Sequence, residues 1–324
     1  MNDTRLDVAA LGELLIDFTE NGRSEQGNPV FEANPGGAPC NVLAMLAKLG
    51  KSTAFIGKVG DDMFGRQLSD AARAAGIGLD GLVFDKSVPT TLAFVKTGED
   101  GDRDFSFYRK PGADVCLKPE EVPVELVEQA KIFHFGSVSM TDEPVRSATK
   151  GAVDRVKKAG ALISFDPNLR PPLWESLEEA KSQIGWGLSR CDILKIADNE
   201  LEFMTGKTDF DRGAAILRRE YPDIRLLNVT AGAGGSYAYY EGLRVYQPAF
   251  TLGGTIETTG AGDCFCGCVL NFVLERGLEG LTEEDLQEML RFANGAAYLV
   301  TTKKGAIRSM PEGQQVQALL DMAL

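Results

Sequence analysis

The stretch that decides the fold begins at Ile132-Phe133-His134-Phe135, continues through the helical pattern of Val145–Lys158 and Gly160, and ends at Leu162-Ile163-Ser164-Phe165. The first and last of these segments are apolar runs of strand length, and the middle one carries apolar residues at helical spacing. Glycine directly after such a pattern is typical of a helix C-terminus. A strand, a helix and a second strand in this order predict two parallel strands joined by a crossover helix.

The same alternation extends over most of the chain. Further strands are predicted at Val8–Leu11, Thr53–Ile56, Ile193–Ile196 and Leu226–Val229. Further amphipathic helices are predicted at Asn41–Leu49, Phe64–Ala75 and Asp211–Glu220. We therefore expect an α/β fold, a three-layer αβα sandwich in which helices cover both faces of a mostly parallel sheet.

Two segments, residues 14–35 and 90–110, lack a helical period and break this alternation. Both are typical of extended chain, with turns expected at Glu20-Asn21-Gly22 and Glu99-Asp100-Gly101-Asp102. A length of 324 residues permits one domain with insertions or two domains. We expect a single domain over residues 1–324, with the two segments forming a small β-sheet lid over the carboxyl ends of the parallel strands, where such folds bind ligands.

Composition excludes several classes of function. The formal net charge of −13 argues against nucleic-acid and anionic-membrane partners, which require basic surfaces. No run reaches the roughly 20 apolar residues of a membrane helix, and the N-terminus does not resemble a secretory signal, so a cytoplasmic location is expected. The six cysteines lack zinc-site spacing, and Cys264, Cys266 and Cys268 are interpreted as small core residues. With His134 as the single histidine, Ser-His-Asp catalysis is excluded.

A candidate anion site lies at Thr258-Thr259-Gly260-Ala261-Gly262-Asp263, which is followed by an apolar helical run. A tight turn that opens a helix leaves backbone N–H groups unpaired, and the helix dipole favours an anion beside them. Asp263 would stand next to that anion, where a carboxylate could take a proton from an attacking hydroxyl. The alternative is an ordinary capped core helix, because Asp is common in a first helical turn.

Other polar motifs follow predicted strands or open predicted helices. Pro35-Gly36-Gly37-Ala38-Pro39-Cys40-Asn41 allows the backbone and Asn41 to approach a polar ligand closely, although a structural turn would explain the glycines alone. Asp166-Pro167-Asn168-Leu169-Arg170 offers Arg170 to a phosphate, or to a structural ion pair. Asn199-Glu200-Leu201-Glu202 offers carboxylates for Mg²⁺ through water, or a solvated helix start. Thr230-Ala231-Gly232-Ala233-Gly234-Gly235 could line a nucleotide groove, or form a plain hairpin.

On these motifs the sequence resembles the ribokinase-like (PfkB) sugar kinases. The segment Pro35–Asn41 looks like the first signature of that family, and Glu257–Asp263 looks like the second. Asn199 and Glu202 fit its N-x-x-E element. The similarity covers nearly the whole chain, and within the family the bacterial and plant fructokinases are nearest. The resemblance implies a ribokinase-like fold with a β-lid.

The resemblance also implies roles for the matching residues. The catalytic group would comprise Asp263 as the base on the sugar hydroxyl, the anion hole of Gly260, Ala261 and Gly262, and Arg170. The sugar would contact Asp17, Gly36, Gly37, Asn41, Phe107, Arg109, Arg170 and Asp263. The nucleotide and its metal would face Lys195, Glu202, Thr230, Gly232, Gly235, Gly260, Gly262 and Asn294, with Glu202 meeting Mg²⁺ through water.

The family also suggests a monovalent cation and a dimer. Glu257 stands where relatives usually have an aspartate that helps to bind K⁺ in cation-dependent members. The longer side chain could preserve or spoil such a site, whose other ligands would be Thr259, Gly305 and Ser309. In some members the lid forms a dimer clasp, which suggests a homodimer through residues 14–35 and 90–110.

The resemblance therefore implies ATP-dependent phosphorylation of D-fructose at its 6-hydroxyl, with ATP and Mg²⁺. A related kinase acting on 2-keto-3-deoxygluconate or ribose is an alternative, because Arg109 and Arg170 could together bind the carboxylate of an acid sugar. Ala38 and Pro39 stand where phosphofructokinase-like relatives often have a lysine, which favours a neutral sugar. A catalytically silent, kinase-like binding protein is a further alternative, but such a protein should have lost Asp263 or its neighbouring glycines.

Overall fold

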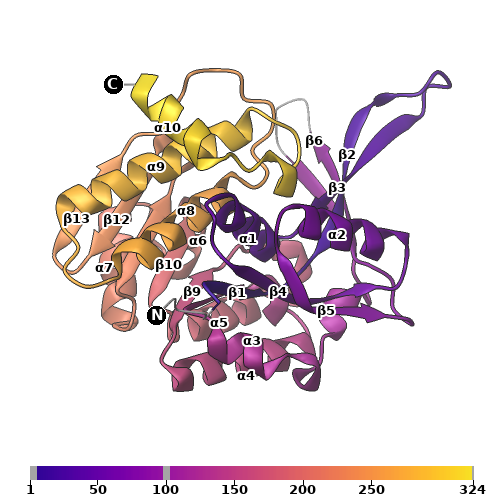
Figure 1. Cartoon of the computed structure of the whole chain (residues 1–324), viewed down its shortest axis with the longest axis horizontal. Helices are drawn as coiled ribbons and strands as arrows, with labels where there is room; N and C mark the ends of the chain where they lie inside the picture. The colour runs from indigo at the N-terminus through magenta and orange to yellow at the C-terminus, as the bar shows by residue number, and fades with distance from the viewer. Residues whose placement is uncertain (1–5, 98–102, 323–324) are drawn as a thin grey trace.

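The computed structural model describes residues 6–97 and 103–322. Within these residues the larger of two sheets has nine strands in the order β13-β12-β11-β10-β9-β8-β1-β4-β5 (Figure 1). The strands from β11 to β5 pair in parallel, and β12 and β13 add an antiparallel hairpin at one edge. The strands span Val8–Leu11 (β1), Thr53–Gly60 (β4), Gly78–Asp85 (β5), Ile132–Gly136 (β8), Leu162–Asp166 (β9), Ile193–Ala197 (β10), Leu226–Thr230 (β11), Ser236–Tyr240 (β12) and Leu243–Gln247 (β13).

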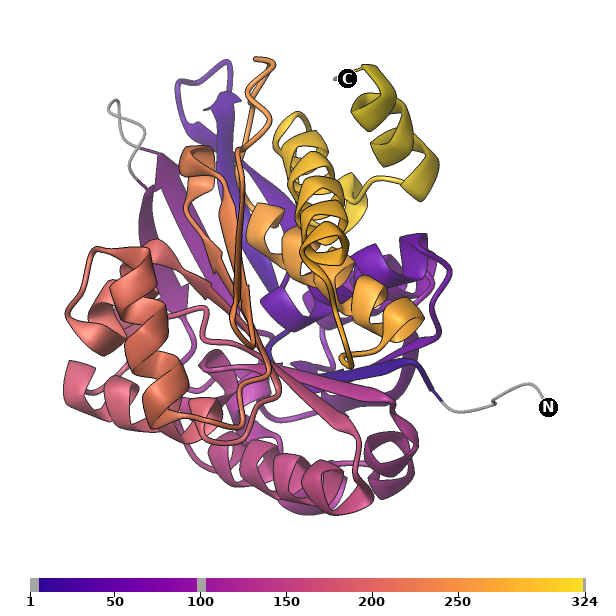
Figure 2. The same ribbon diagram turned by 90° about the vertical axis from the view of Figure 1, so that its left-hand side faces the viewer.

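Helices cover both faces of this sheet, as Figure 2 shows edge-on. One layer packs the helices Ala38–Lys48 (α1), Met63–Ala74 (α2), Ala261–Arg276 (α8), Glu283–Thr301 (α9) and Gly313–Met322 (α10). The other packs the helices Val124–Gln129 (α3), Val145–Ala159 (α4), Leu177–Leu188 (α5), Asp198–Thr205 (α6) and Phe210–Glu220 (α7). Along β1, Val8 and Ala10 join the first layer whereas Ala9 and Leu11 join the second. The strand is apolar throughout because both of its faces are buried. The predicted αβα arrangement is confirmed.

The smaller sheet has the order β3-β2-β6-β7, from Leu15–Arg23 (β2), Pro29–Gly36 (β3), Leu92–Thr97 (β6) and Arg103–Tyr108 (β7). Its β2–β3 hairpin projects from the body of the molecule (Figure 1). The turn of that hairpin was expected at Glu20-Asn21-Gly22, but it lies at Ser24–Asn28, where Ser24 N–H donates to the Asn28 carbonyl over 2.9 Å. Gly22 instead lies in an irregularity of the β2–β3 pairing, with a φ of 84°. The second expected turn, Glu99–Asp102, lies outside the described residues.

Two sequence interpretations concern the core. Cys264, Cys266 and Cys268 are buried on α8 between the sheet and its neighbouring helices. His134 is buried in β8, and its Nδ1 lies 3.0 Å from the Ser164 hydroxyl of β9. Burial lowers the pKa of His134 to about 3, so the imidazole is neutral at physiological pH.

In the described part of the chain, no helix combines the length and apolar character needed to span a bilayer.

Candidate active site

The carboxyl ends of the parallel strands lie beneath the smaller sheet, and a cavity of about 220 Å³ separates them. We call it the lid cavity. Its walls come from the smaller sheet, from the start of α1, from the loops after β8 and β9, and from the first turn of α8. The lining includes Glu13, Asp17, Asn41, Phe107, Val138, Arg170, Lys195, Glu257, Gly262 and Asp263.

A second cavity of about 560 Å³, the loop cavity, opens on the other side of the first turn of α8. It is lined by the loop after β11, by residues 249–255 and by one side of α9. Thr258 and Gly262 line both cavities, so the start of α8 separates them. The turn and helix start that the sequence predicts at residues 258–263 therefore lie between two cavities, each of which could hold a small ligand.

The start of α8 is built by glycine. Gly260 has a φ of 81°, which favours glycine, and a Cβ added there would lie 3.0 Å from the Cβ of Ala306. The Ala261 N–H donates to the Thr258 carbonyl over 3.3 Å, which closes the turn. Asp263 follows in the first helical turn, where the amides of a helix N-terminus stabilise negative charge.

Asp263 lies at the centre of the site. Its Oδ2 accepts a hydrogen bond of 2.7 Å from Asn41 Nδ2, which comes from the first turn of α1. Burial raises the pKa of Asp263 to about 6; Asp166 adds to this, whereas Asn41, Lys195 and the more distant Arg170 oppose it. A carboxylate with such a pKa is deprotonated at neutral pH and can still accept a proton readily.

A buried ion pair lies against the same turn. Lys195 Nζ contacts the two carboxylate oxygens of Asp166 at 3.0 and 3.2 Å, and it would lie 3.3 Å from a Cβ on Gly262. Burial alone would lower the pKa of Lys195, but Asp166 and Glu200 raise it, so the ammonium stays charged. Glu200 in turn accepts backbone N–H groups of Ala197 at 2.9 Å and Leu169 at 2.7 Å. The sequence motifs that contain Asp166 and Glu200 do not mark them as site residues, because only the fold brings both carboxylates to the buried Lys195.

Glu13 is a cavity residue that the sequence analysis missed. Its side chain is 5% exposed, and Oε1 accepts the Ala38 N–H over 2.9 Å at the start of α1. Burial raises the pKa of Glu13 to about 7. Gly37 has a φ of 133°, and any Cβ there would collide with the Glu13 carbonyl oxygen. Gly36 is constrained likewise, because a Cβ on it would lie 2.5 Å from Asp17 Oδ2.

Of the three residues expected together around the sugar, Phe107 and Arg170 line the lid cavity but Arg109 does not. Arg109 is buried, and its three guanidinium nitrogens donate to Asp114, Thr141 and the Val138 carbonyl. The interpretation of Arg109 as a cavity residue therefore does not match its position. The family resemblance implied a place for it beside Phe107, but its guanidinium is paired with Asp114 at the base of the small sheet.

The residues expected to face a nucleotide divide into three groups. Thr230, Gly232, Gly235, Gly262 and Asn294 line the loop cavity. Asn294 Nδ2 also donates to the carbonyls of Gln247 and Pro248, both at 3.1 Å, which fixes the loop after β13. Lys195 and Gly260 line the lid cavity instead, and Glu202 is exposed on α6 and lines neither cavity.

Three of the four residues considered for K⁺ are in direct contact. Glu257 accepts the Thr259 hydroxyl over 2.6 Å with one oxygen and the Gly305 N–H over 3.1 Å with the other. Ser309, the fourth residue, follows Gly305 closely in the chain. It is buried, and its hydroxyl donates to the Ala306 carbonyl over 2.8 Å. Among the described residues, no group of three or more His, Cys, Asp or Glu side chains is arranged to hold a metal ion.

Comparison with known proteins identifies the family. A family model described as pfkB family carbohydrate kinase matches residues 5–313. A protein named probable fructokinase-2 from Arabidopsis thaliana is 44% identical over 306 residues, which are 94% of this chain and 92% of that protein. The chain belongs to the pfkB family of carbohydrate kinases. This confirms the resemblance drawn from the two glycine-containing motifs.

Solved structures agree with that assignment. A fructokinase from Xylella fastidiosa with bound ATP has a TM-score of 0.88 at 32% identity, with 98% of each chain covered. A double mutant of the Vibrio cholerae O395 fructokinase, in a form with bound fructose, ADP and potassium ion, has a TM-score of 0.85 at 28% identity and covers 98% of this chain and 99% of that one. The ribokinase-like fold with its small separate sheet is confirmed.

Proposed function

We propose that this protein is a fructokinase, which transfers the γ-phosphoryl group of ATP to the 6-hydroxyl of D-fructose and releases fructose 6-phosphate and ADP. The observation that carries this proposal is the first turn of α8, which separates the lid cavity from the loop cavity and brings Asp263 to the lid cavity. The plant and bacterial fructokinases that match nearly the whole chain support the choice of sugar.

The sugar would bind in the lid cavity. Asp17, Asn41 and the backbone of Gly37 line the cavity and would present polar groups to its hydroxyls, and Phe107 and Arg170 add an apolar and a charged wall. Gly36 does not line the cavity, but its lack of a side chain leaves room for the Asp17 carboxylate. Asp263 would take the proton of the 6-hydroxyl while that oxygen bonds to the γ-phosphorus and the bond to the β-phosphate oxygen breaks. The small sheet above the cavity would exclude water, which is itself an acceptor.

The nucleotide would bind in the loop cavity, along Thr230, Gly232, Gly235 and Asn294. Its phosphates would then point to the first turn of α8. The amides of Gly260, Ala261 and Gly262, together with Arg170, would stabilise the charge on the transferring group. Ala261 contributes least to this, because its N–H already donates to the Thr258 carbonyl. Lys195 lies beside Gly262 and would add positive charge there.

The donor set fits a magnesium ion held mainly by phosphate oxygens and water. Glu202 is an exposed carboxylate on α6 outside both cavities, so its contact with such an ion would have to run through water, of which Mg²⁺ keeps several. When bound, Mg²⁺ would neutralise charge on the β- and γ-phosphates.

We infer a second cation site, for K⁺, at Glu257. Its carboxylate accepts hydrogen bonds from the Thr259 hydroxyl and the Gly305 N–H, and Ser309 follows in the chain. A K⁺ ion there would contact oxygen ligands beside the anion hole.

Salt exchange tests the cation. Replacing NaCl by KCl at equal ionic strength should raise kcat, and Glu257→Ala should remove that response while retaining the fold. Equal turnover of the natural enzyme in both salts would mean that the extra methylene of Glu257 does not support a functional K⁺ site.

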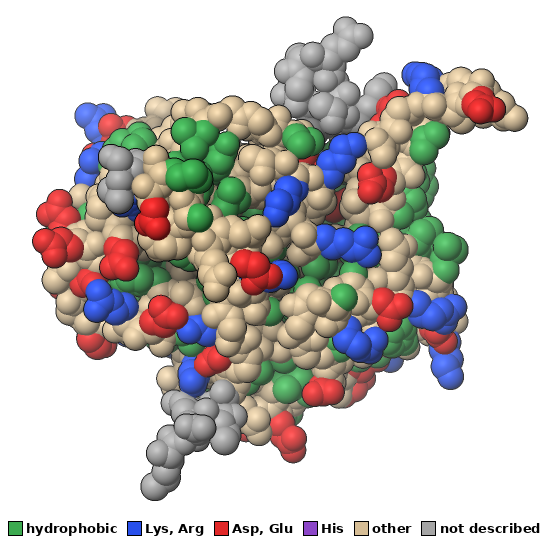
Figure 3. Space-filling model, turned by 45° about the horizontal axis from the view of Figure 1, so that its top comes forward, with side chains coloured by type: hydrophobic (Ala, Val, Ile, Leu, Met, Phe, Trp, Pro, Cys, Tyr) green, Lys and Arg blue, Asp and Glu red, His purple; other side chains and the backbone are tan. Residues whose placement is uncertain are grey.

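A homodimer through the small sheet is also proposed. The sheet exposes Val30, Phe31 and Tyr108, and the ring of Phe94 packs edge-on against both Phe31 and Tyr108. Elsewhere, acidic and basic side chains are interspersed over the face shown in Figure 3. Light scattering should give twice the 34.9 kDa chain mass, and Phe31→Asp with Tyr108→Lys should reduce it to one chain. A single-chain mass for the unaltered protein contradicts the dimer.

The position of Arg109 bears on the alternative substrates. A kinase for 2-keto-3-deoxygluconate was considered because Arg109 and Arg170 could bind a carboxylate together, but Arg109 is engaged elsewhere. A neutral sugar is thereby favoured over an acid sugar. A silent binding protein is disfavoured because Asp263 and its anion-hole turn are intact.

A coupled assay of ADP release tests the proposal. D-Fructose, D-ribose and 2-keto-3-deoxygluconate are compared at saturating MgATP, and fructose should give the highest kcat/KM. A higher value for either other sugar would overturn the choice of substrate. Absence of ADP release with all three would favour the binding protein.

A further inference from the structure

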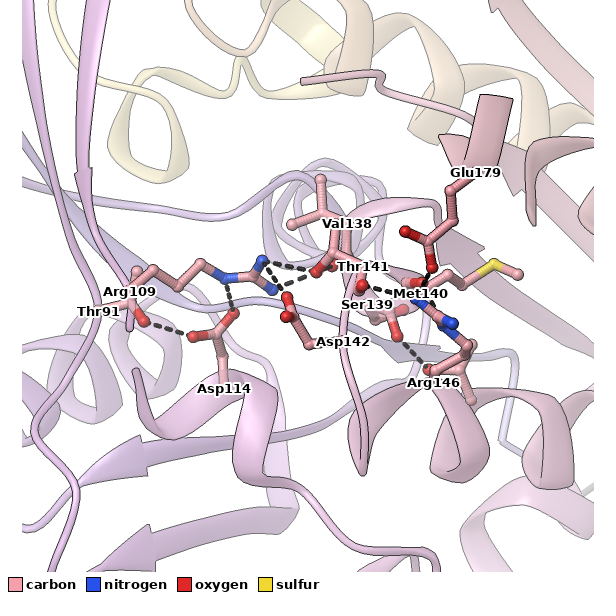
Figure 4. A network of polar contacts seen from close by, with 11 residues as sticks. Thr91, Arg109, Asp114, Val138, Ser139, Met140, Thr141, Asp142, Arg146 and Glu179 are labelled. Atoms are coloured by element: carbon pink, nitrogen blue, oxygen red, sulfur yellow. Dashed lines mark hydrogen bonds and ion pairs between the residues drawn. The ribbon is translucent and has the colours of Figure 1, made fainter. Parts of the chain in front are cut away.

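Arg109 occupies the base of the small sheet, directly after β7 (Figure 4). Its side chain is 4% exposed, and Nε donates to Asp114 Oδ2 over 2.8 Å. Nη1 donates to Thr141 Oγ1 over 2.8 Å, and Nη2 donates to the Val138 carbonyl over 3.0 Å. A planar guanidinium suits such a site because its fixed fork of donors can hold three partners in one geometry.

Asp114 links both ends of the β6–β7 hairpin. Its second oxygen accepts the hydroxyl of Thr91, which immediately precedes β6, while its first oxygen holds Arg109, which immediately follows β7. A Cβ on Gly112 would collide with the Thr91 hydroxyl, so the chain packs closely at this point. One buried carboxylate thus fixes the two chain segments through which this hairpin joins the body.

The contacts continue from this point to the wall of the lid cavity. Val138, whose carbonyl Arg109 holds, lines the cavity beneath the small sheet. On the other side, the Thr91 carbonyl accepts the Ile16 N–H over 3.2 Å, and both neighbours of Ile16, Leu15 and Asp17, line the cavity. Arg109 therefore does not line the lid cavity, but hydrogen bonds connect it to residues on two walls of that cavity.

We propose that Arg109 and Asp114 are positioning residues that fix the small sheet and Val138 around the sugar. This rests on the proposed function of the lid cavity. The pair acts by setting the height and angle of β6 and β7 above the cavity floor, so its loss should weaken sugar binding and leave the nucleotide side unchanged. Small displacements of positioning groups are costly in catalysis, which makes the effect measurable.

The chain offers a matched control. Arg146 of α4 holds the same turn from its far side, donating to the carbonyls of Met140 at 2.7 Å and Thr141 at 2.6 Å, and to Glu179 (Figure 4). It is a partly buried arginine with a carboxylate partner, but among the described residues its side chain hydrogen-bonds only to Met140, Thr141 and Glu179, none of which belongs to the small sheet. Arg146→Gln should therefore destabilise the fold without the specific effect on sugar binding.

The experiment compares Arg109→Gln with Arg146→Gln by steady-state kinetics and thermal unfolding. Arg109→Gln should raise the sugar KM by about tenfold or more, with kcat and the KM for ATP within about threefold, whereas Arg146→Gln should keep the sugar KM within about twofold at a similar loss of Tm. An unchanged sugar KM in Arg109→Gln, or equal increases in both variants, would overturn the proposal.

Milder variants keep the proposal testable if Arg109→Gln does not fold. Thr141→Val removes one acceptor of Arg109, and Thr141→Ser restores it, so only the valine variant should raise the sugar KM. Hydrogen exchange gives a readout that needs no sugar: amides of β6 and β7 should exchange faster in Thr141→Val than in Thr141→Ser. Equal exchange and equal KM would overturn the proposal. Faster exchange in an enzyme that phosphorylates no fructose would retain the positioning role and reject the substrate.

Discussion

Asn41 and Asp263 are 222 positions apart in the chain, yet the amide nitrogen of Asn41 donates to the Asp263 carboxylate over 2.7 Å. The bond joins the first turn of α1 to the first turn of α8, and therefore joins the two glycine-containing motifs of the sequence. It orients the carboxylate toward the lid cavity and lowers its pKa against the effect of burial. The proposed base is thus held in place by a residue proposed to touch the sugar.

Asp263→Asn should lower kcat by roughly 10²- to 10⁴-fold, the range ascribed to a general base. The amide has nearly the same shape but cannot accept the hydroxyl proton, so the affinity for ATP should change little. Single-turnover kinetics and calorimetric titration with ATP measure the two quantities. Turnover within a few-fold of the natural enzyme would show that another group accepts the proton.

Asn41→Leu should move the acid limb of the kcat profile to higher pH. Asn41 lowers the pKa of Asp263, which lies at about 6, so loss of this donor should raise that pKa further. The base must be deprotonated to act, and activity should therefore be lost at a higher pH as the solution is acidified. Activity at pH 6 should fall more than activity at pH 8. A profile that keeps its shape would contradict the role of this hydrogen bond.

The fold was largely predictable because both faces of the parallel strands are buried. Six predicted strands begin at the residues where the structure begins them, although most continue to a polar or glycine residue such as Asp166 or Thr230. The apolar pattern stops before those residues, so periodicity alone could not include them. The strand Gly78–Asp85 was missed for a similar reason, because it lies at the sheet edge and is only partly buried.

The site residues were predictable where they lie in a short motif at the start of a helix. The turn at 258–263 and the glycines at 36 and 37 come directly before helices, and such positions can be read from sequence. Glu13 and Arg109 could not be read in this way, because their partners are distant or depend on burial. A charged side chain next to a strand can face a cavity or a buried carboxylate, and only the packing of Asp114 decides which one.

Glu13→Gln should stabilise the protein more at pH 8 than at pH 5. Burial raises the pKa of Glu13 from 4.5 to about 7, so the folded state binds more protons than the unfolded state between these values. Stability contributed by the protonated form is therefore present below pH 4.5 and is lost as pH rises through 7. The glutamine stays neutral and can still accept the Ala38 N–H.

The gain from Glu13→Gln at pH 8 should be at most about 3 kcal/mol, the free energy equivalent of the pKa change. Urea unfolding of both proteins at pH 5 and pH 8 measures it. A stability difference that does not depend on pH would mean that Glu13 titrates normally in the folded protein.

The Asp166–Lys195 pair should be strongly coupled. Both side chains are less than one-tenth exposed, so Lys195→Met or Asp166→Leu alone leaves a buried charge without its partner, which typically costs 3–5 kcal/mol. The double variant should lose much less than the sum, because no uncompensated charge of this pair remains. The exposed Arg66–Asp61 pair is the control, since Arg66→Gln should change stability by at most about 1 kcal/mol. Additive losses at Asp166 and Lys195 would mean that Glu200 or Asp263, rather than Asp166, stabilises the ammonium.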